Sequence, residues 1–88
     1  MSLDSIRQFI IDSLRAMNYD VAGIGDDTEL GPRGADLESL ALAELAIRVE
    51  DEYALRFGDD EAEKLAVMTV GEFCQTIAAR ISPAPAAG

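Results

Sequence analysis

The sequence predicts an all-α fold: a small four-helix bundle of three long helices and one short third helix, with a long loop between the first two. Apolar residues recur at helical spacing in three separate stretches, and glycine and proline interrupt that spacing between them. At 88 residues the chain is large enough for one core and too small for an enclosed catalytic cleft. We therefore expect one domain over residues 1–81 and a disordered Pro/Ala tail over 82–88.

The first helix is expected from Leu3 to about Asn18. Its apolar positions follow the period of a helix and are Leu3, Ile6, Ile10, Leu14 and Met17. Because this stripe is continuous and faces one way, it is typical of a core-facing surface.

Residues 19–37 lose the helical period and contain several glycines and a proline, so they predict a long loop. Asp27 and Thr28 are candidates for the start of a short helical turn within it. The residues expected to pin the loop to the core are Val21, Ile24, Leu30 and Leu37. The acidic residues of the loop do not fit the ligand spacing of an EF-hand, so we reject a calcium loop of that kind.

Two capping signals predict the last two helices. Asp60, with Glu63 three residues later, predicts a short third helix through about Ala66. Thr69 and Glu72 form a capping box, which starts a final helix that runs to residue 81. Residue 74 of that helix is the chain's one cysteine; it falls on the apolar stripe, where it acts as a small hydrophobe rather than a nucleophile.

The second helix is expected to follow Ser39 directly and to end near Arg56. At about 100° per residue, its core-facing positions are Leu42, Leu45, Ala46, Val49 and Tyr53. The positions on the opposite face are Leu40, Glu44, Ile47 and Asp51. This second face should meet water, so its two branched apolar residues among carboxylates predict a docking stripe for another protein.

Ser39 stands where the loop becomes the helix. The first N–H groups of a helix lack partners within it, and the helix dipole puts partial positive charge there, so a phosphate ester on this hydroxyl would be well placed. The alternative is that Ser39 or Asp36 simply caps the helix.

The stretch resembles the modification site of acyl carrier proteins, in which aspartate, serine and leucine open the second helix and the serine carries 4′-phosphopantetheine. The matching residues here are Glu38, Ser39 and Leu40, followed by Ala43-Glu44-Leu45 and the acidic run Glu50-Asp51-Glu52. The similarity extends from Leu3 to Ile81. The chain departs from the family in having Glu38 in place of the aspartate and a longer lead-in over residues 30–37.

The resemblance implies a carrier that holds acyl intermediates as thioesters on a 4′-phosphopantetheine arm at Ser39, for fatty-acid or polyketide biosynthesis. The implied partners are a phosphopantetheinyl transferase, a ketosynthase and other acyl-processing enzymes with basic docking surfaces. Candidate recognition residues are Glu38, Leu40, Glu44, Ile47 and Asp51. No catalytic residue and no metal ligand is expected on the chain itself.

Composition excludes several other classes of function. With 17 acidic and 7 basic residues, the net charge of −10 argues against binding to nucleic acid or to an anionic membrane. One cysteine and no histidine exclude disulfides, the usual zinc sites and imidazole-dependent triads, so the chain is not expected to be an enzyme. Without an apolar leader or membrane span, a cytoplasmic location is the expectation. The high negative charge is typical of a monomeric protein.

Three alternatives remain open. A peptidyl (aminoacyl) carrier would use the same serine for a different cargo. A helical interaction module without a prosthetic group would bind its partner directly through Leu40 and Ile47. An enzyme that uses Glu44 and Asp51 as acid and base ranks third, because an open, solvated face does nothing to raise the pKa of a carboxyl group.

Overall fold

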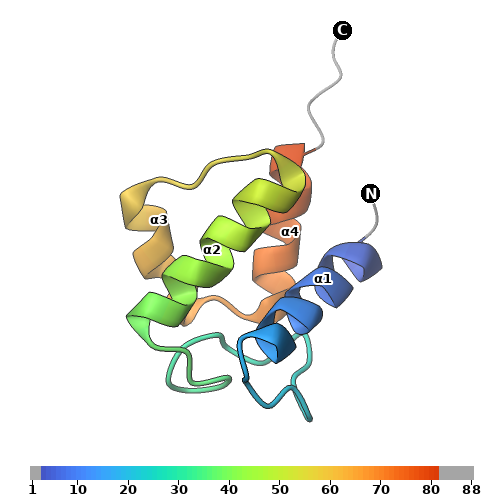
Figure 1. The fold of residues 1–88 in the computed structure, drawn as a ribbon, viewed down its shortest axis with the longest axis vertical. Helices are drawn as coiled ribbons and strands as arrows, with labels where there is room; N and C mark the ends of the chain where they lie inside the picture. The colour runs from blue at the N-terminus through green and yellow to red at the C-terminus, as the bar shows by residue number, and fades with distance from the viewer. Residues whose placement is uncertain (1–2, 82–88) are drawn as a thin grey trace, which may run out of the picture.

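The structure is a computed structural model that describes residues 3–81, with every side chain of that range except those of Asp59 and Ala62. Its elements in chain order are α1 (Leu3–Ala16), α2 (Ser39–Tyr53), α3 (Asp59–Lys64), the 3₁₀ turn η1 (Leu65–Val67) and α4 (Val70–Ile81) (Figure 1). No β-strand occurs in residues 3–81, so the all-α prediction is confirmed. The tail expected over 82–88 lies outside the described residues.

The prediction of a four-helix bundle is wrong. α1, α2 and α4 have 14, 15 and 12 residues, whereas α3 has 6 and gives way at once to η1. At 3.6 residues per turn α3 completes less than two turns, which is too short to pack along the length of its neighbours. The fold is three packed helices, with α3 and η1 resting mainly on α2 (Figure 1).

The core lies where α1 meets α4 and α2. Each of the three long helices contributes most of the apolar stripe predicted for it; the fully buried side chains include Ile6, Ile10, Leu14, Leu45, Val49, Phe73 and Ile77. Leu3, the first position predicted for the stripe of α1, is instead exposed at the start of the helix. Cys74 is also buried, and this burial raises the pKa of its thiol. Its predicted role as a small core hydrophobe is therefore confirmed.

The loop between α1 and α2 is bound to the segment that precedes α4. Four backbone hydrogen bonds join the two segments, donated by Leu30 to Met68, by Gly31 to Ala66, by Val70 to Thr28 and by Gly71 to Asp26. Leu30 and Leu37 are buried as predicted, and Val21 and Ile24 pack against the core. No helical turn forms at Asp27 and Thr28, because these residues belong instead to a turn closed between residues 25 and 28 and to this short ladder.

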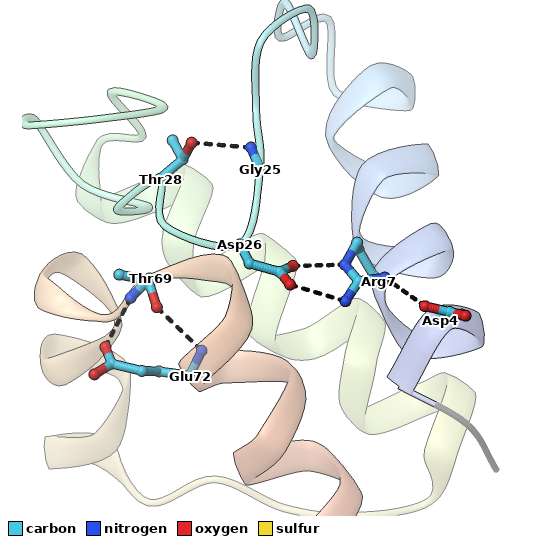
Figure 2. Close-up of polar contacts among 7 residues, drawn as sticks. All are labelled: Asp4, Arg7, Gly25, Asp26, Thr28, Thr69 and Glu72. Atoms are coloured by element: carbon cyan, nitrogen blue, oxygen red, sulfur yellow. Dashed lines mark hydrogen bonds and ion pairs between the residues drawn. The ribbon is translucent and has the colours of Figure 1, made fainter.

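Arg7 ties the same loop to α1. Its guanidinium donates to both carboxylate oxygens of Asp26, at 2.6 and 3.0 Å, and to Asp4 at 2.6 Å (Figure 2). Bidentate pairing of this kind holds both partners in one orientation. The loop is thus anchored on α1 through a side chain and on residues 66–71 through its backbone.

The capping box predicted at the start of α4 is confirmed. The Thr69 N–H donates to Glu72 Oε1 at 2.9 Å, and the Glu72 N–H donates to Thr69 Oγ1 at 3.1 Å (Figure 2). Two otherwise unpaired donors are thereby satisfied, which defines where the helix begins.

The boundaries of α2 and α3 differ from those predicted. α2 stops at Tyr53, three residues early, because Ala54 adopts a left-handed conformation (φ 56°) and donates its N–H to the Glu50 carbonyl. α3 begins at residue 59 rather than 60, because the Gly58 N–H donates a hydrogen bond to Glu61 Oε1 at 2.7 Å. The end of α2 is thus set by a backbone–backbone bond, and the start of α3 by a bond from a backbone N–H to the Glu61 side chain.

Replacing Ala54 with glycine should raise the free energy of unfolding by about 0.5–1 kcal/mol. The left-handed conformation costs a residue with a Cβ roughly 1–2 kcal/mol, and glycine avoids this cost. Part of the gain is offset because glycine has more conformational freedom in the unfolded chain and loses it on folding. Chemical denaturation of both proteins measures the difference. Ala79→Gly, in the helical interior of α4, is the matched control and should destabilise; a loss of stability in Ala54→Gly would contradict the left-handed cap.

Candidate functional site

Ser39 is the first residue of α2 and its side chain is exposed. The residue before it, Glu38, is the N-cap, with extended backbone (φ −78°, ψ 170°), and no side chain makes a capping hydrogen bond. Asp36 lies further back, in a left-handed conformation (φ 65°). The alternative in which Ser39 or Asp36 caps the helix is therefore wrong, and the hydroxyl is not used to close the helix end.

A small pocket of about 230 Å³ lies beside this serine. Its walls are Ser39 and Leu42 from α2, Glu63 from α3 and Ala66 from η1. Sequence reasoning missed Glu63 and Ala66 as neighbours of Ser39. Residues 39 and 42 share a helix face, but the element that covers that face depends on how α3 and η1 fold back on α2, so no local pattern indicated these two neighbours.

The predicted docking stripe lies on the surface. Leu40 and Ile47 are 83% and 56% exposed, and Glu44 and Asp51 are exposed beside them. Four of the five positions predicted to face the core are buried and the fifth, Tyr53, is half-buried. The two faces of α2 are thus assigned correctly, whereas the role of the exposed face in partner recognition stays a prediction.

The carboxylates of this region are not equivalent. Glu44 Oε2 accepts two hydrogen bonds from the Arg48 guanidinium, at 3.1 and 3.0 Å, so its charge is partly neutralised. Glu50 accepts the Phe57 N–H at 2.8 Å and so stabilises the turn after α2. Asp51 has no ion pair within the described part of the chain. Of these three, Asp51 offers the least encumbered negative charge to a partner.

Arg80 of α4 holds the first turn of α3 and the segment that leads into it. The Arg80 guanidinium donates to the Arg56 carbonyl at 2.8 Å, pairs with both carboxylate oxygens of Glu61, and lies 5.2 Å from the centre of the Phe57 ring. These contacts fix the approach of the chain to α3, and α3 in turn carries Glu63 to the pocket beside Ser39.

Replacing Glu38 with aspartate should stabilise the chain by about 0.5–1 kcal/mol. Aspartate is a favoured N-cap whose shorter side chain reaches the N–H groups of the first turn, while Glu38 makes no such bond. Thermal melts measure the effect, with Glu38→Gln as the control that removes charge but keeps length. Equal melting temperatures for wild type and Glu38→Asp would show that the end of α2 needs no cap.

Neither a metal site nor a membrane-spanning helix is found in the described residues. Between residues 3 and 81, no three or more acidic or cysteine side chains are grouped so as to hold a metal ion. None of the helices in that range has both the length and the apolar character needed to cross a membrane.

The site of interest is therefore an exposed serine at an uncapped helix start, next to a pocket and an exposed acidic and apolar stripe. Comparisons of the chain with protein-family models and with curated proteins found no match.

Proposed function

We propose that the chain is an acyl carrier that holds acyl intermediates on a 4′-phosphopantetheine arm attached to Ser39. The observation that carries the proposal is the exposed Ser39 hydroxyl at the uncapped N-terminus of a 15-residue helix. The residue order around it, Glu38-Ser39-Leu40, resembles the modification site of acyl carrier proteins.

The surroundings of Ser39 suit a phosphodiester. Among the described side chains, none is bonded to the free N–H groups at the start of α2, and no acidic residue stands in its first turn. The helix dipole would favour a negative charge there by roughly 0.3–1 kcal/mol. The pocket formed with Leu42, Glu63 and Ala66 offers the first part of an arm a partly apolar surface.

The chain's own part in loading is to present a nucleophile. Ser39 Oγ would attack the phosphorus next to the pantetheine of coenzyme A, forming a new O–P bond as the bond to the nucleotide's phosphate breaks. The hydroxyl proton would pass to a base of the transferase. Once attached, the arm supplies a terminal thiol that holds acyl groups as thioesters; Cys74 is buried and takes no part.

The exposed stripe of α2 would then bring the carrier to its enzymes. A phosphopantetheinyl transferase and a ketosynthase with basic docking surfaces are the proposed partners, attracted by a protein of net charge −10. A tethered cargo reaches each enzyme at a high effective concentration, which is how a domain without catalytic residues contributes to a reaction sequence.

Intact mass after coexpression with a broad-specificity phosphopantetheinyl transferase tests the proposal. A mass increase of one phosphopantetheine supports it. An unmodified chain, when a known carrier is modified in the same cells, would contradict it.

A second candidate function is a helical interaction module without a prosthetic group. It is favoured by one observation, the exposure of Leu40 and Ile47 on the outer face of α2. The same mass measurement separates the two candidates, because an interaction module stays unmodified.

A further inference from the structure

The pocket beside Ser39 adjoins a larger groove. This groove has a volume of about 500 Å³ and is lined by Glu29, Pro32 and Arg33 of the long loop and by Ala66 and Val67 of η1. Ala66 lines both hollows, so a group attached to Ser39 can pass from one to the other along η1.

The loop side of the groove is rigidly built. Gly31 donates its N–H to the Ala66 carbonyl at 3.2 Å, and a Cβ on Gly31 would lie 2.3 Å from that oxygen. The Gly34 N–H closes a turn onto the Gly31 carbonyl at 3.1 Å, which leaves Pro32 and Arg33 at the two central positions. The turn therefore presents Arg33 at a defined place against η1.

Arg33 is available to bind an anion. Four other arginines are engaged in ion pairs, and these are Arg7, Arg15, Arg48 and Arg80. No carboxylate among the described side chains pairs with Arg33, although Glu29 lines the same groove. Among the described side chains Arg56 and Lys64 likewise have no ion pair, but Arg56 lies beyond the far end of α2 and Lys64 lines a separate hollow on α4.

We propose that this groove receives the end of the loaded arm and that Arg33 binds the free carboxylate of a short acyl group derived from a dicarboxylic acid. The inference rests on the proposed function. A guanidinium matches a carboxylate with two parallel hydrogen bonds, and in a chain of net charge −10 an anionic cargo needs such a cation to approach the surface. A cargo that ends in a methyl group gains nothing from it.

Glu29 and Glu63 are the acidic groups along this path. Both repel a carboxylate, so the cargo's free end must lie on the Arg33 side of the groove. Removing the charge with Glu29→Gln should strengthen the contact, whereas Arg33→Gln should abolish it.

The test compares two loaded forms of the full chain. A transferase attaches succinyl-phosphopantetheine, labelled with ¹³C in its free carboxyl, or the neutral butyryl analogue, from the corresponding coenzyme A thioesters. In the succinyl form we expect the pKa of the cargo carboxyl to be about half a unit lower in wild type than in Arg33→Gln, since a nearby cation favours the ionised form and exposure weakens the effect. Glu29→Gln should lower it further.

The amide signals of residues 33 and 66 provide the second readout, and they should shift on succinylation but not with butyryl cargo. Shifts of equal size with both cargoes would assign Arg33 to the arm's own phosphodiester and overturn the inference. An identical carboxyl pKa in wild type and Arg33→Gln would also overturn it. A chain that gains no mass contradicts the proposed function and the inference together, whereas a chain that is loaded without these effects contradicts the inference alone.

Discussion

Phe73→Ala should lower the free energy of unfolding by about 3–5 kcal/mol, the range typical of removing a buried phenylalanine. Phe73 is fully buried on α4, and its ring centre lies 5.8 Å from that of Phe57, in the turn before α3. A domain of this size is stable by only about 5–15 kcal/mol, so the variant should be near the limit of folding at physiological temperature. Denaturant titration followed by circular dichroism measures the loss.

Phe73→Leu is the control, because it keeps an apolar side chain and should lose less stability. The loss in Phe73→Ala should also loosen α3, since Phe57 contacts both Phe73 and Arg80. Hydrogen exchange at residues 61–66 would then be faster than at α1. A stability change below about 1 kcal/mol for Phe73→Ala would show that the core is centred elsewhere.

Asp51→Lys should slow association with a basic transferase by about tenfold at low salt, within the range known for electrostatic steering. Glu44→Lys should do the same but also breaks the pair with Arg48, so Asp51→Lys is the cleaner test. The wild-type rate should itself fall as salt rises, because exposed charges act over a Debye length of only about 8 Å at physiological ionic strength. Stopped-flow fluorescence measures the association rates. Thermal melts check the folding of each variant, whose free energy of unfolding should change by no more than about 0.5 kcal/mol.

Glu52→Lys makes the same change in net charge, from −10 to −8, on a different face of the same helix. It should affect the rate much less than Asp51→Lys does. Equal slowing by the two variants would mean that the transferase responds to net charge and not to the stripe. Ile47→Ala should instead speed dissociation, because its apolar contact is lost only after the complex has formed.

The long helices could be predicted well from the sequence, because the spacing of apolar residues at the helical period indicates which side chains of each helix are buried. The apolar stripes of α1 and α4 and the two faces of α2 came from the spacing of residues alone, and the structure confirms them except at Leu3, which is exposed. The start of α4 was also predictable, since the capping box at Thr69 and Glu72 is a local interaction between residues three apart.

The errors fall where distant parts of the chain meet. α3 was expected to be a bundle member, but whether six residues form a packing helix depends on contacts with α2 and on Arg80. The early stop of α2 at Ala54 needs a left-handed alanine, which residue preference disfavours. The neighbours of Ser39 on α3 and η1 could not be predicted, because they lie 24 to 27 residues further along the chain and reach it only through the tertiary fold.

The loop of residues 19–37 shows the same limit. Its glycines and proline predicted a long loop that a few apolar residues pin to the core. The structure also binds this loop by Arg7 and by the ladder to residues 66–71. These partners are far away in sequence, so no local pattern could reveal that the loop forms one wall of the groove next to the serine.

The central claim is that Ser39 carries the arm, and intact mass of two serine variants tests it most directly. Wild type, Ser39→Ala and Ser5→Ala are incubated with coenzyme A and a phosphopantetheinyl transferase; Ser5 is the control because it is also an exposed serine, on α1. Circular dichroism first establishes that all three are folded. We expect wild type and Ser5→Ala to gain one phosphopantetheine and Ser39→Ala to gain none, whereas an adduct that persists on Ser39→Ala would contradict the account.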